Sequence, residues 1–188
     1  LSITFVNWLV TQIVPPRVLP KLEFKKGIPK DCATAIAMPV LVANASDIPS
    51  LLQRLEAHRL ANSDTALQFV LLSDFADADA EDMPPDADIT QALVSGVDEL
   101  NKRYPGARGD GPFHLLHRPR LYNETQGSWM GWERKRGKLE QFNAYILHGI
   151  STPFSVIAGR IDALRKCRFV VTADADTRLP HGVVRRLV

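Results

Sequence analysis

Residues 168–176 of this chain read RFVVTADAD and join an apolar run of strand length, Arg168–Thr172, to a pair of aspartates. The apolar run predicts a buried β-strand, because β-branched and aromatic residues favour strands. Asp174 and Asp176 stand two residues apart directly after this run. Two carboxylates at that spacing reach the same side of a turn. The stretch therefore predicts a strand whose carboxyl end carries polar chemistry.

Further apolar runs of strand length alternate with helical patterns along the rest of the chain. The predicted strands are Ala33–Leu41, Leu67–Leu72, Phe113–His117 and Phe154–Ala158, and the predicted helices are Ile48–Arg59, Ile89–Arg103 and Gly137–His148. Such alternation is typical of a mostly parallel sheet with helices on both faces, so we predict a three-layer α/β fold. Ligands bind at the carboxyl ends of the strands in such sheets, and we expect the site just after Leu41, Leu72 and Thr172.

The composition is that of an ordinary globular protein. The chain has 188 residues, enough for about one domain with its own core. It has 23 basic and 21 acidic residues, a formal net charge of +2, and 45% hydrophobic residues. This balance excludes collagen-like, coiled-coil and wholly disordered chains, and it argues against a dedicated nucleic-acid binder. Cys32 and Cys167 lack the spacing of a metal or redox motif, which predicts two buried thiols in a reducing compartment.

Aspartates follow two of the predicted strands. Asp174 and Asp176 offer hard oxygen ligands suited to a Mg²⁺ or Mn²⁺ ion that bridges a diphosphate. The alternative interpretation of this pair is a turn or a helix N-cap. Asp74 follows the predicted strand Leu67–Leu72 and is placed to accept hydrogen bonds from the base or ribose of a nucleotide. The alternative for Asp74 is a carboxylate that caps the loop.

A basic segment, Trp129–Asn143, reads WMGWERKRGKLEQFN and places a group of cationic residues at the start of a predicted helix. These residues are Arg134, Lys135, Arg136 and Lys138. Helix N-termini attract anions, and Gly137 lets the backbone approach closely. Three interpretations stay open: a solvated basic surface, a nucleic-acid contact in which Trp129 and Trp132 stack on bases, and a site for the diphosphate of a sugar nucleotide.

The N-terminal segment, Leu1–Val14, reads LSITFVNWLVTQIV, and its apolar residues recur at helical spacing. At ~1.5 Å per residue such a helix is too short to span ~30 Å of hydrocarbon, and it lacks the features of a signal peptide. Pro15 and Pro16 end the helix, and a basic group follows, made of Arg17, Lys21, Lys25 and Lys26. The segment predicts either a helix packed against the domain or a helix at a membrane surface.

The order of these features resembles that of family-2-like GT-A glycosyltransferases: a first strand, a strand with Asp74, the basic segment, and a strand with D-A-D-T. More closely, VNWLVTQIVPPRVLPKLEF (6–24), WMGWERKRGKLEQFN (129–143) and VVTADADTRLP (170–180) resemble the glycosyltransferase region of cyclic β-1,2-glucan synthases. The resemblance covers nearly the whole chain. It implies the nucleotide-binding half of a GT-A, Rossmann-like domain from a large inner-membrane enzyme of Gram-negative bacteria. Such an enzyme builds and cyclises β-1,2-glucan from UDP-glucose by a metal-assisted inverting displacement.

The resemblance also implies which residues bind the donor. Asp174 would contact the ribose or the metal, and Asp176 would bind the metal, so the two form a DxD motif for Mg²⁺ or Mn²⁺. Asp74 would read the uridine, and Pro39 would border the same pocket. The remaining donor-binding residues would be Gly137 and Lys138, near the diphosphate or ribose.

Two parts are expected from the resemblance, a membrane-proximal N-terminal arm at 1–30 and a truncated nucleotide-sugar-binding domain at 31–188. A general base is expected beyond Val188, so no catalytic residue and no turnover by the fragment alone are predicted. The expected partners are UDP-glucose, the growing β-1,2-glucan and, through neighbouring segments, the cytoplasmic face of the inner membrane, but no nucleic acid. A cut sheet would expose apolar surface and a strand edge, which predicts a homodimer of the fragment through Leu1–Val14 or the C-terminal helix.

Overall fold

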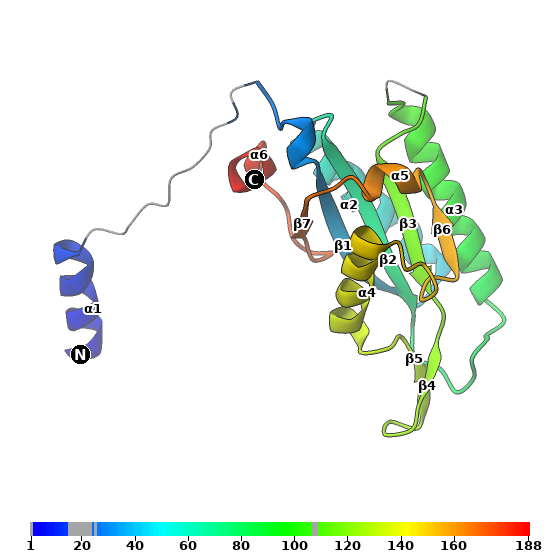
Figure 1. Cartoon of the computed structure of the whole chain (residues 1–188). Helices are drawn as coiled ribbons and strands as arrows, with labels where there is room; N and C mark the ends of the chain where they lie inside the picture. Colours follow the sequence, from blue (N-terminus) through cyan, green and yellow to red (C-terminus); the bar gives the residue numbers. More distant parts are fainter. Residues whose placement is uncertain (1, 15–23, 25, 107–108) are drawn as a thin grey trace.

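The computed structural model describes residues 2–14, 24, 26–106 and 109–188. The strands are β1 (Thr34–Val42), β2 (Leu67–Phe75), β3 (Phe113–Arg118), β4 (Leu121–Asn123), β5 (Ser128–Met130), β6 (Val156–Ala158) and β7 (Phe169–Thr172). The helices are α1 (Ser2–Ile13), α2 (Ile48–Ala61), α3 (Asp86–Arg103), α4 (Arg134–His148), α5 (Ile161–Leu164) and α6 (Val183–Leu187), with 3₁₀ turns at Lys30–Cys32 and Ala45–Asp47. Figure 1 shows their arrangement.

The main sheet has five strands in the order β6-β3-β2-β1-β7. β1, β2, β3 and β7 are parallel, whereas β6 runs antiparallel to β3. The chain passes from β1 through β2 to β3 on one side, and β7 then pairs with the other side of β1. The strand order therefore reverses at β1, and the crevice at such a reversal is where ligands bind in open α/β sheets.

Helices cover both faces of this sheet, and each face has its own core (Figure 1). Successive residues of a strand point to opposite faces. Ile36 and Met38 of β1 thus join the core that α2 and α3 cover, and Ala35 and Ala37 join the core that α4 covers. The predicted three-layer α/β fold with a mostly parallel sheet is confirmed, and it is consistent with a Rossmann-like glycosyltransferase domain.

The predicted strands and helices of the sheet domain are all present, with boundaries that differ by a few residues. β2 differs in a way that matters, since it continues past Leu72 to Phe75. Its polar end stays in the sheet because strands pair with it on both sides: Asp74 lies opposite Leu41 on β1 and Arg118 on β3. Asp74 therefore belongs to the strand and does not follow it.

α4 also starts earlier than predicted, at Arg134 and not at Gly137. The residue before the helix, Glu133, and its first residue, Arg134, have φ values of 49° and 47°. Residues other than glycine rarely adopt this left-handed conformation. The extra turn of helix brings Arg134 and Lys135 into the first helical residues.

The N-terminal helix is present as α1, Ser2–Ile13. Its apolar side chains are not buried on the sheet domain, since Ile3, Phe5 and Ile13 are 77%, 60% and 68% exposed. Among the described residues, no helix has both the length and the apolar character needed to cross a bilayer. The predicted basic residues Arg17, Lys21 and Lys25 and the two prolines before them lie outside the described residues.

The two cysteines are free thiols. Cys167 is buried as predicted, and burial raises the pKa of its thiol to about 12. Cys32 is only half-buried. The elevated pKa keeps the Cys167 thiol protonated at neutral pH, so it behaves as a packing residue.

Candidate functional site

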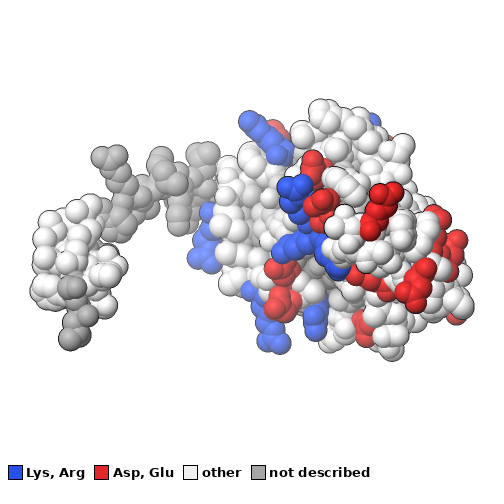
Figure 2. Space-filling model, turned by 90° about the horizontal axis from the view of Figure 1, so that it is seen from below, with Lys and Arg blue, Asp and Glu red and all other residues white. Residues whose placement is uncertain are grey.

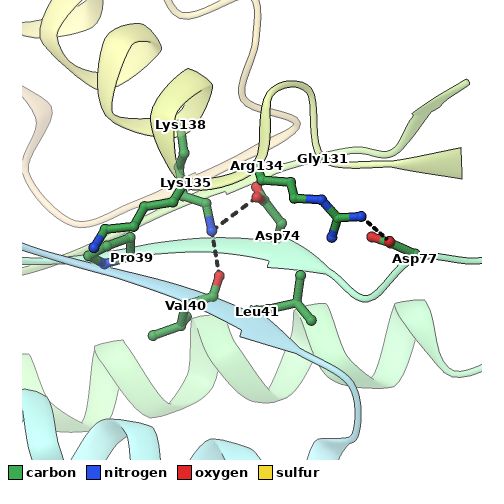
Figure 3. A pocket seen from close by; sticks show the side chains of 9 residues that line it. All are labelled: Pro39, Val40, Leu41, Asp74, Asp77, Gly131, Arg134, Lys135 and Lys138. Carbon is green, nitrogen blue, oxygen red and sulfur yellow. Dashed lines mark hydrogen bonds and ion pairs between the residues drawn. The ribbon is translucent and has the colours of Figure 1, made fainter. Parts of the chain in front are cut away.

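A pocket of about 250 Å³ opens at the carboxyl ends of β1 and β2, beneath the first turn of α4 (Figure 3). It lies beside the point where the strand order reverses. The lining residues are Pro39, Val40, Leu41, Asp74, Asp77, Gly131, Arg134, Lys135 and Lys138. The sheet and the helix thus bring acidic and basic side chains, far apart in sequence, to one edge of the domain.

Asp74 forms the buried floor of this pocket. Its carboxylate accepts two hydrogen bonds from the guanidinium of Arg118, at 2.7 Å and 2.8 Å, and lies 3.0 Å from Lys138 Nζ. The three side chains are between 2% and 4% exposed. The single negative charge of Asp74 therefore faces the positive charges of two buried side chains. Its two oxygens are already engaged within the protein.

Lys138 is the second cation on Asp74. Its ammonium also donates a hydrogen bond to the carbonyl oxygen of Val40, as Figure 3 shows. Burial lowers the pKa of Lys138, and the neighbouring Asp74 carboxylate opposes that shift. Lys138 thus joins the end of β1 to β2 and α4, and its ammonium is not exposed to the pocket solvent as a free charge.

Arg134 and Lys135, one turn earlier in α4, are the exposed cations of the pocket. Arg134 Nη2 donates to Asp77 Oδ2 at 2.8 Å and to Gln126 Oε1 at 3.1 Å. Lys135 forms an ion pair with Asp174, and both side chains are about half exposed, at 53% and 51%. Because ion pairs at this exposure are weak, either cation is free to exchange its partner for a bound anion.

The Asp174–Asp176 pair lies in the turn after β7, and both carboxylates are exposed. Asp174 reaches the pocket edge through Lys135, but neither aspartate lines the pocket. Arg54 Nη1 donates to the carbonyl of Ala175 at 3.0 Å and so holds the turn. Within the described part of the chain, no group of three or more His, Cys, Asp or Glu residues could hold a metal ion.

Two further predicted donor-binding residues occupy different positions. Pro39 lines the pocket from β1. Gly137 does not line it: a Cβ on Gly137 would lie 2.4 Å from the carbonyl oxygen of Trp132. The close approach that a glycine permits here is therefore between α4 and the preceding turn. The structure brings Pro39, Asp74 and Lys138 together in one pocket, with Asp174 at its edge, and their roles toward a ligand stay predictions.

Arg118 contacts Asp74 from the neighbouring strand and is not part of any motif that the sequence shows. The only signal is the position of Arg118 one residue past a predicted strand, and its meaning depends on the β2–β3 register. A second missed signal concerns α4. Phe142 and Tyr145 define its buried face, and Lys138 lies one turn earlier on that same face. This spacing indicates a buried Lys138 but does not distinguish it from Lys135, which lies two turns before Phe142 on the same side and is exposed because it precedes the buried part of the helix.

His117 of β3 is buried beside this site. Its Nδ1 lies 2.8 Å from Ser73 Oγ, and its ring packs edge-on against Phe75. Burial lowers the pKa of His117 to about 4. The carboxylate of Asp74 partly opposes this shift, and the ammonium of Lys138 adds to it. The imidazole is therefore neutral near pH 7.

Charges of both signs are interspersed on the face of the molecule drawn in Figure 2. No uniform basic surface covers that face. Trp132 is 42% exposed, but Trp129 is half-buried and packs against Tyr122 across the β4–β5 hairpin.

No protein-family model matches the chain. The chain is 40% identical over 182 residues to the cyclic beta-(1,2)-glucan synthase NdvB of Rhizobium meliloti (strain 1021). The matched region is 97% of this chain but only 6% of that protein. The resemblance to cyclic β-1,2-glucan synthases that the motifs indicate is thereby confirmed, as a match to one segment of such an enzyme over nearly the whole of this chain.

Proposed function

We propose that this chain is the donor-binding part of a glucosyltransferase that takes glucose from UDP-glucose to build cyclic β-1,2-glucan. The similarity to NdvB supports the glycosyltransferase class and the product. The donor and the metal are proposals that rest on the pocket. The observation that carries them is the convergence of Lys135, Arg134 and Asp174 at the carboxyl edge of the sheet.

Asp174 and Asp176 are the residues that would hold a divalent metal. Both carboxylates are exposed, and their oxygens suit Mg²⁺ or Mn²⁺. Two protein ligands suffice for such a site, because Mg²⁺ is usually bound through one or two carboxylates together with substrate phosphates and water. When bound, the metal would neutralise charge on the departing diphosphate.

The chain's own cations would share this task. Lys135 and Arg134 project from the first turn of α4, where the helix N-terminus also favours an anion. A diphosphate in the pocket would replace Asp174 as the partner of Lys135 and would release that carboxylate. Positive groups fixed in advance around the leaving group lower the barrier to glycosyl transfer, which we propose to be an inverting displacement.

The uridine would occupy the pocket floor near Pro39 and Asp74. Because both oxygens of Asp74 already accept hydrogen bonds, we propose that this carboxylate acts on the nucleotide chiefly by holding Lys138 and Arg118 in place. The pocket volume, about 250 Å³, is below the ~300–1,000 Å³ typical of ligand sites. We therefore propose that the described residues supply the donor side of a larger site and do not turn over substrate alone.

The cellular setting of this function is carried over from the resemblance alone. We propose the cytoplasmic face of a Gram-negative inner membrane, with residues 1–30 as a membrane-proximal arm and 31–188 as the sugar-nucleotide domain. The apolar side chains of α1 are exposed, and this supports an N-terminal arm whose apolar surface packs against something other than the sheet domain. They support a homodimer of the chain equally well.

Isothermal titration calorimetry of the chain with UDP, with and without Mn²⁺, tests the donor and metal proposals. We expect binding that requires Mn²⁺ and is lost in Asp176→Asn. The matched control is Asp98→Asn, which removes an exposed carboxylate from α3 and should leave binding unchanged. Salt-sensitive binding of an oligonucleotide without any response to UDP would instead favour a nucleic-acid module and would overturn the proposal.

A further inference from the structure

The turn at the start of α4 has a strained backbone. Glu133 and Arg134 follow each other in the left-handed region, with φ values of 49° and 47°. For residues other than glycine this conformation is costly and persists only where surrounding contacts determine it. Arg134 and Lys135, the first two residues of α4, are the exposed cations of the pocket.

Arg118 supplies two side-chain contacts to this turn, beside the backbone hydrogen bond from Arg134 N–H to the carbonyl of Gly131 at 3.0 Å. Its Nη1 donates to the carbonyl of Trp132 at 3.0 Å, and its Nη2 donates to the carbonyl of Arg134 at 3.1 Å. These two bonds fix the backbone on either side of Glu133. A third bond, 2.6 Å from Nη1 to Gln141 Oε1, fixes the next turns of α4.

The remaining hydrogen-bonding capacity of Arg118 anchors it to the sheet. Nε and Nη2 donate to the two oxygens of Asp74, so every N–H of the guanidinium has a partner. The side chain is only 2% exposed. Gly131 permits this packing, because a Cβ there would lie 2.5 Å from Asp74 Oδ2 and 3.0 Å from Arg118 Nη2.

We propose that Arg118 is a positioning residue for the anion site. It contacts no ligand itself, but it ties the strained turn at the start of α4 to the carboxylate of Asp74. It thereby directs Arg134 and Lys135 at the pocket. The effect on affinity rests on the proposed function, whereas the hold on the turn can be measured without a ligand.

The test compares two buried arginines at the end of β3 and just beyond it. Arg118→Lys keeps the positive charge but replaces the planar fork with a single ammonium. Arg120→Lys is the matched control: Arg120 is 5% exposed, pairs with Asp86 and donates to the carbonyl of Ala76 at 2.7 Å, and does not line the pocket. Both variants lose the paired hydrogen bonds of a buried guanidinium to a carboxylate, so the free energy of unfolding should fall in both.

Three quantities are measured on the full chain and both variants: thermal unfolding, backbone hydrogen exchange, and the affinity for UDP with Mn²⁺. Arg118→Lys should speed exchange at residues 132–138 and weaken UDP binding about tenfold, the loss expected for one charge-assisted hydrogen bond. Arg120→Lys should speed exchange at residues 81–86, which Arg120 contacts away from the pocket, and leave UDP affinity unchanged. Gln141→Met, a milder variant, should shift exchange and affinity in the same direction as Arg118→Lys if that variant is too unstable to study.

Exchange at residues 132–138 that stays at the wild-type rate in Arg118→Lys and Gln141→Met would overturn the proposal. So would UDP affinity that falls equally in Arg118→Lys and Arg120→Lys, because the effect would then follow general stability. If the wild-type chain binds no UDP, the proposed function fails. The exchange measurement still decides whether Arg118 holds the turn.

Discussion

Replacing Asp74 by asparagine tests the buried charges directly, because the change keeps the shape of the side chain and removes its charge. Arg118 and Lys138 would then be two buried cations without a carboxylate, where distances of 2.7 Å, 2.8 Å and 3.0 Å now join them to Asp74. Breaking a buried ion pair by removing one partner costs about 3–5 kcal/mol. At ~2–4 °C per kcal/mol for a chain of this size, the melting temperature should fall by about 6–20 °C.

The assay is a double-mutant cycle followed by thermal and urea unfolding. Lys138→Met in the Asp74→Asn background removes one uncompensated cation, so the double variant should be more stable than Asp74→Asn alone. The cost of Asp74→Asn should also be smaller at pH 9 than at pH 6. Burial lowers the pKa of Lys138, and without the carboxylate of Asp74, which raises it, the lysine releases its proton more readily as the pH rises.

A different outcome would identify Asp74 as a ligand-binding carboxylate. Asp74→Asn would then unfold within about 1 kcal/mol of the wild type, the range of an exposed ion pair, while its UDP affinity is lost. A double variant that is no more stable than Asp74→Asn would equally contradict the charge arrangement described for the pocket floor.

Three other substitutions separate ligand binding from stability around this pocket. Lys135→Met should weaken UDP binding by about tenfold in calorimetry, the loss expected for one charge-assisted hydrogen bond. The same change should alter the free energy of unfolding by at most ~1 kcal/mol, because the Lys135–Asp174 ion pair is half exposed. His117→Asn should flatten the pH dependence of urea unfolding. The pKa of His117 is about 4 in the folded chain and ~6.5 in the unfolded chain. The contribution of the neutral imidazole to the free energy of unfolding is therefore complete above pH 6.5 and is lost as the pH falls toward 4. Gly131→Ala should lower the unfolding free energy by about 1–3 kcal/mol, because its Cβ would lie 2.5 Å from Asp74 Oδ2.

Each of these results has a clear opposite. An unchanged UDP affinity in Lys135→Met would remove this lysine from the anion site. A pH profile of His117→Asn parallel to that of the wild type would mean that His117 titrates equally in the folded and unfolded states. A Gly131→Ala chain of wild-type stability would show that the turn does not press against the carboxylate of Asp74.

The sequence predicts the fold well because the fold depends on local patterns. Apolar runs such as Leu67–Leu72 mark buried strands, and the alternation with helices determines a parallel sheet. The carboxyl edge of that sheet then follows as the place for chemistry. The prediction of residues near Asp74 and the start of α4 as site candidates rests on this topology.

The contacts within the site depend on information that no local pattern carries. The pairing of Asp74 with Arg118 requires the register of β2 against β3. The early start of α4 requires a strained turn that Arg118 holds through backbone carbonyls. The different surroundings of Lys135 and Lys138 do not follow from the helix phase, since both lie on the side of Phe142. They follow from the position of Lys135 in the first turn of α4, before the buried residues begin at Gly137.

The most direct measurement of the central claim is paramagnetic broadening of backbone amide signals in the ¹⁵N-labelled chain by Mn²⁺ and UDP, with Mg²⁺ and UDP as the diamagnetic reference. If the pocket at the carboxyl ends of β1 and β2 binds the metal–nucleotide complex, broadening should be confined to residues 38–42, 73–77, 131–138 and 172–177. It should require UDP and be lost in Asp176→Asn. Broadening centred elsewhere, or broadening by Mn²⁺ that UDP does not change, would contradict the proposed site.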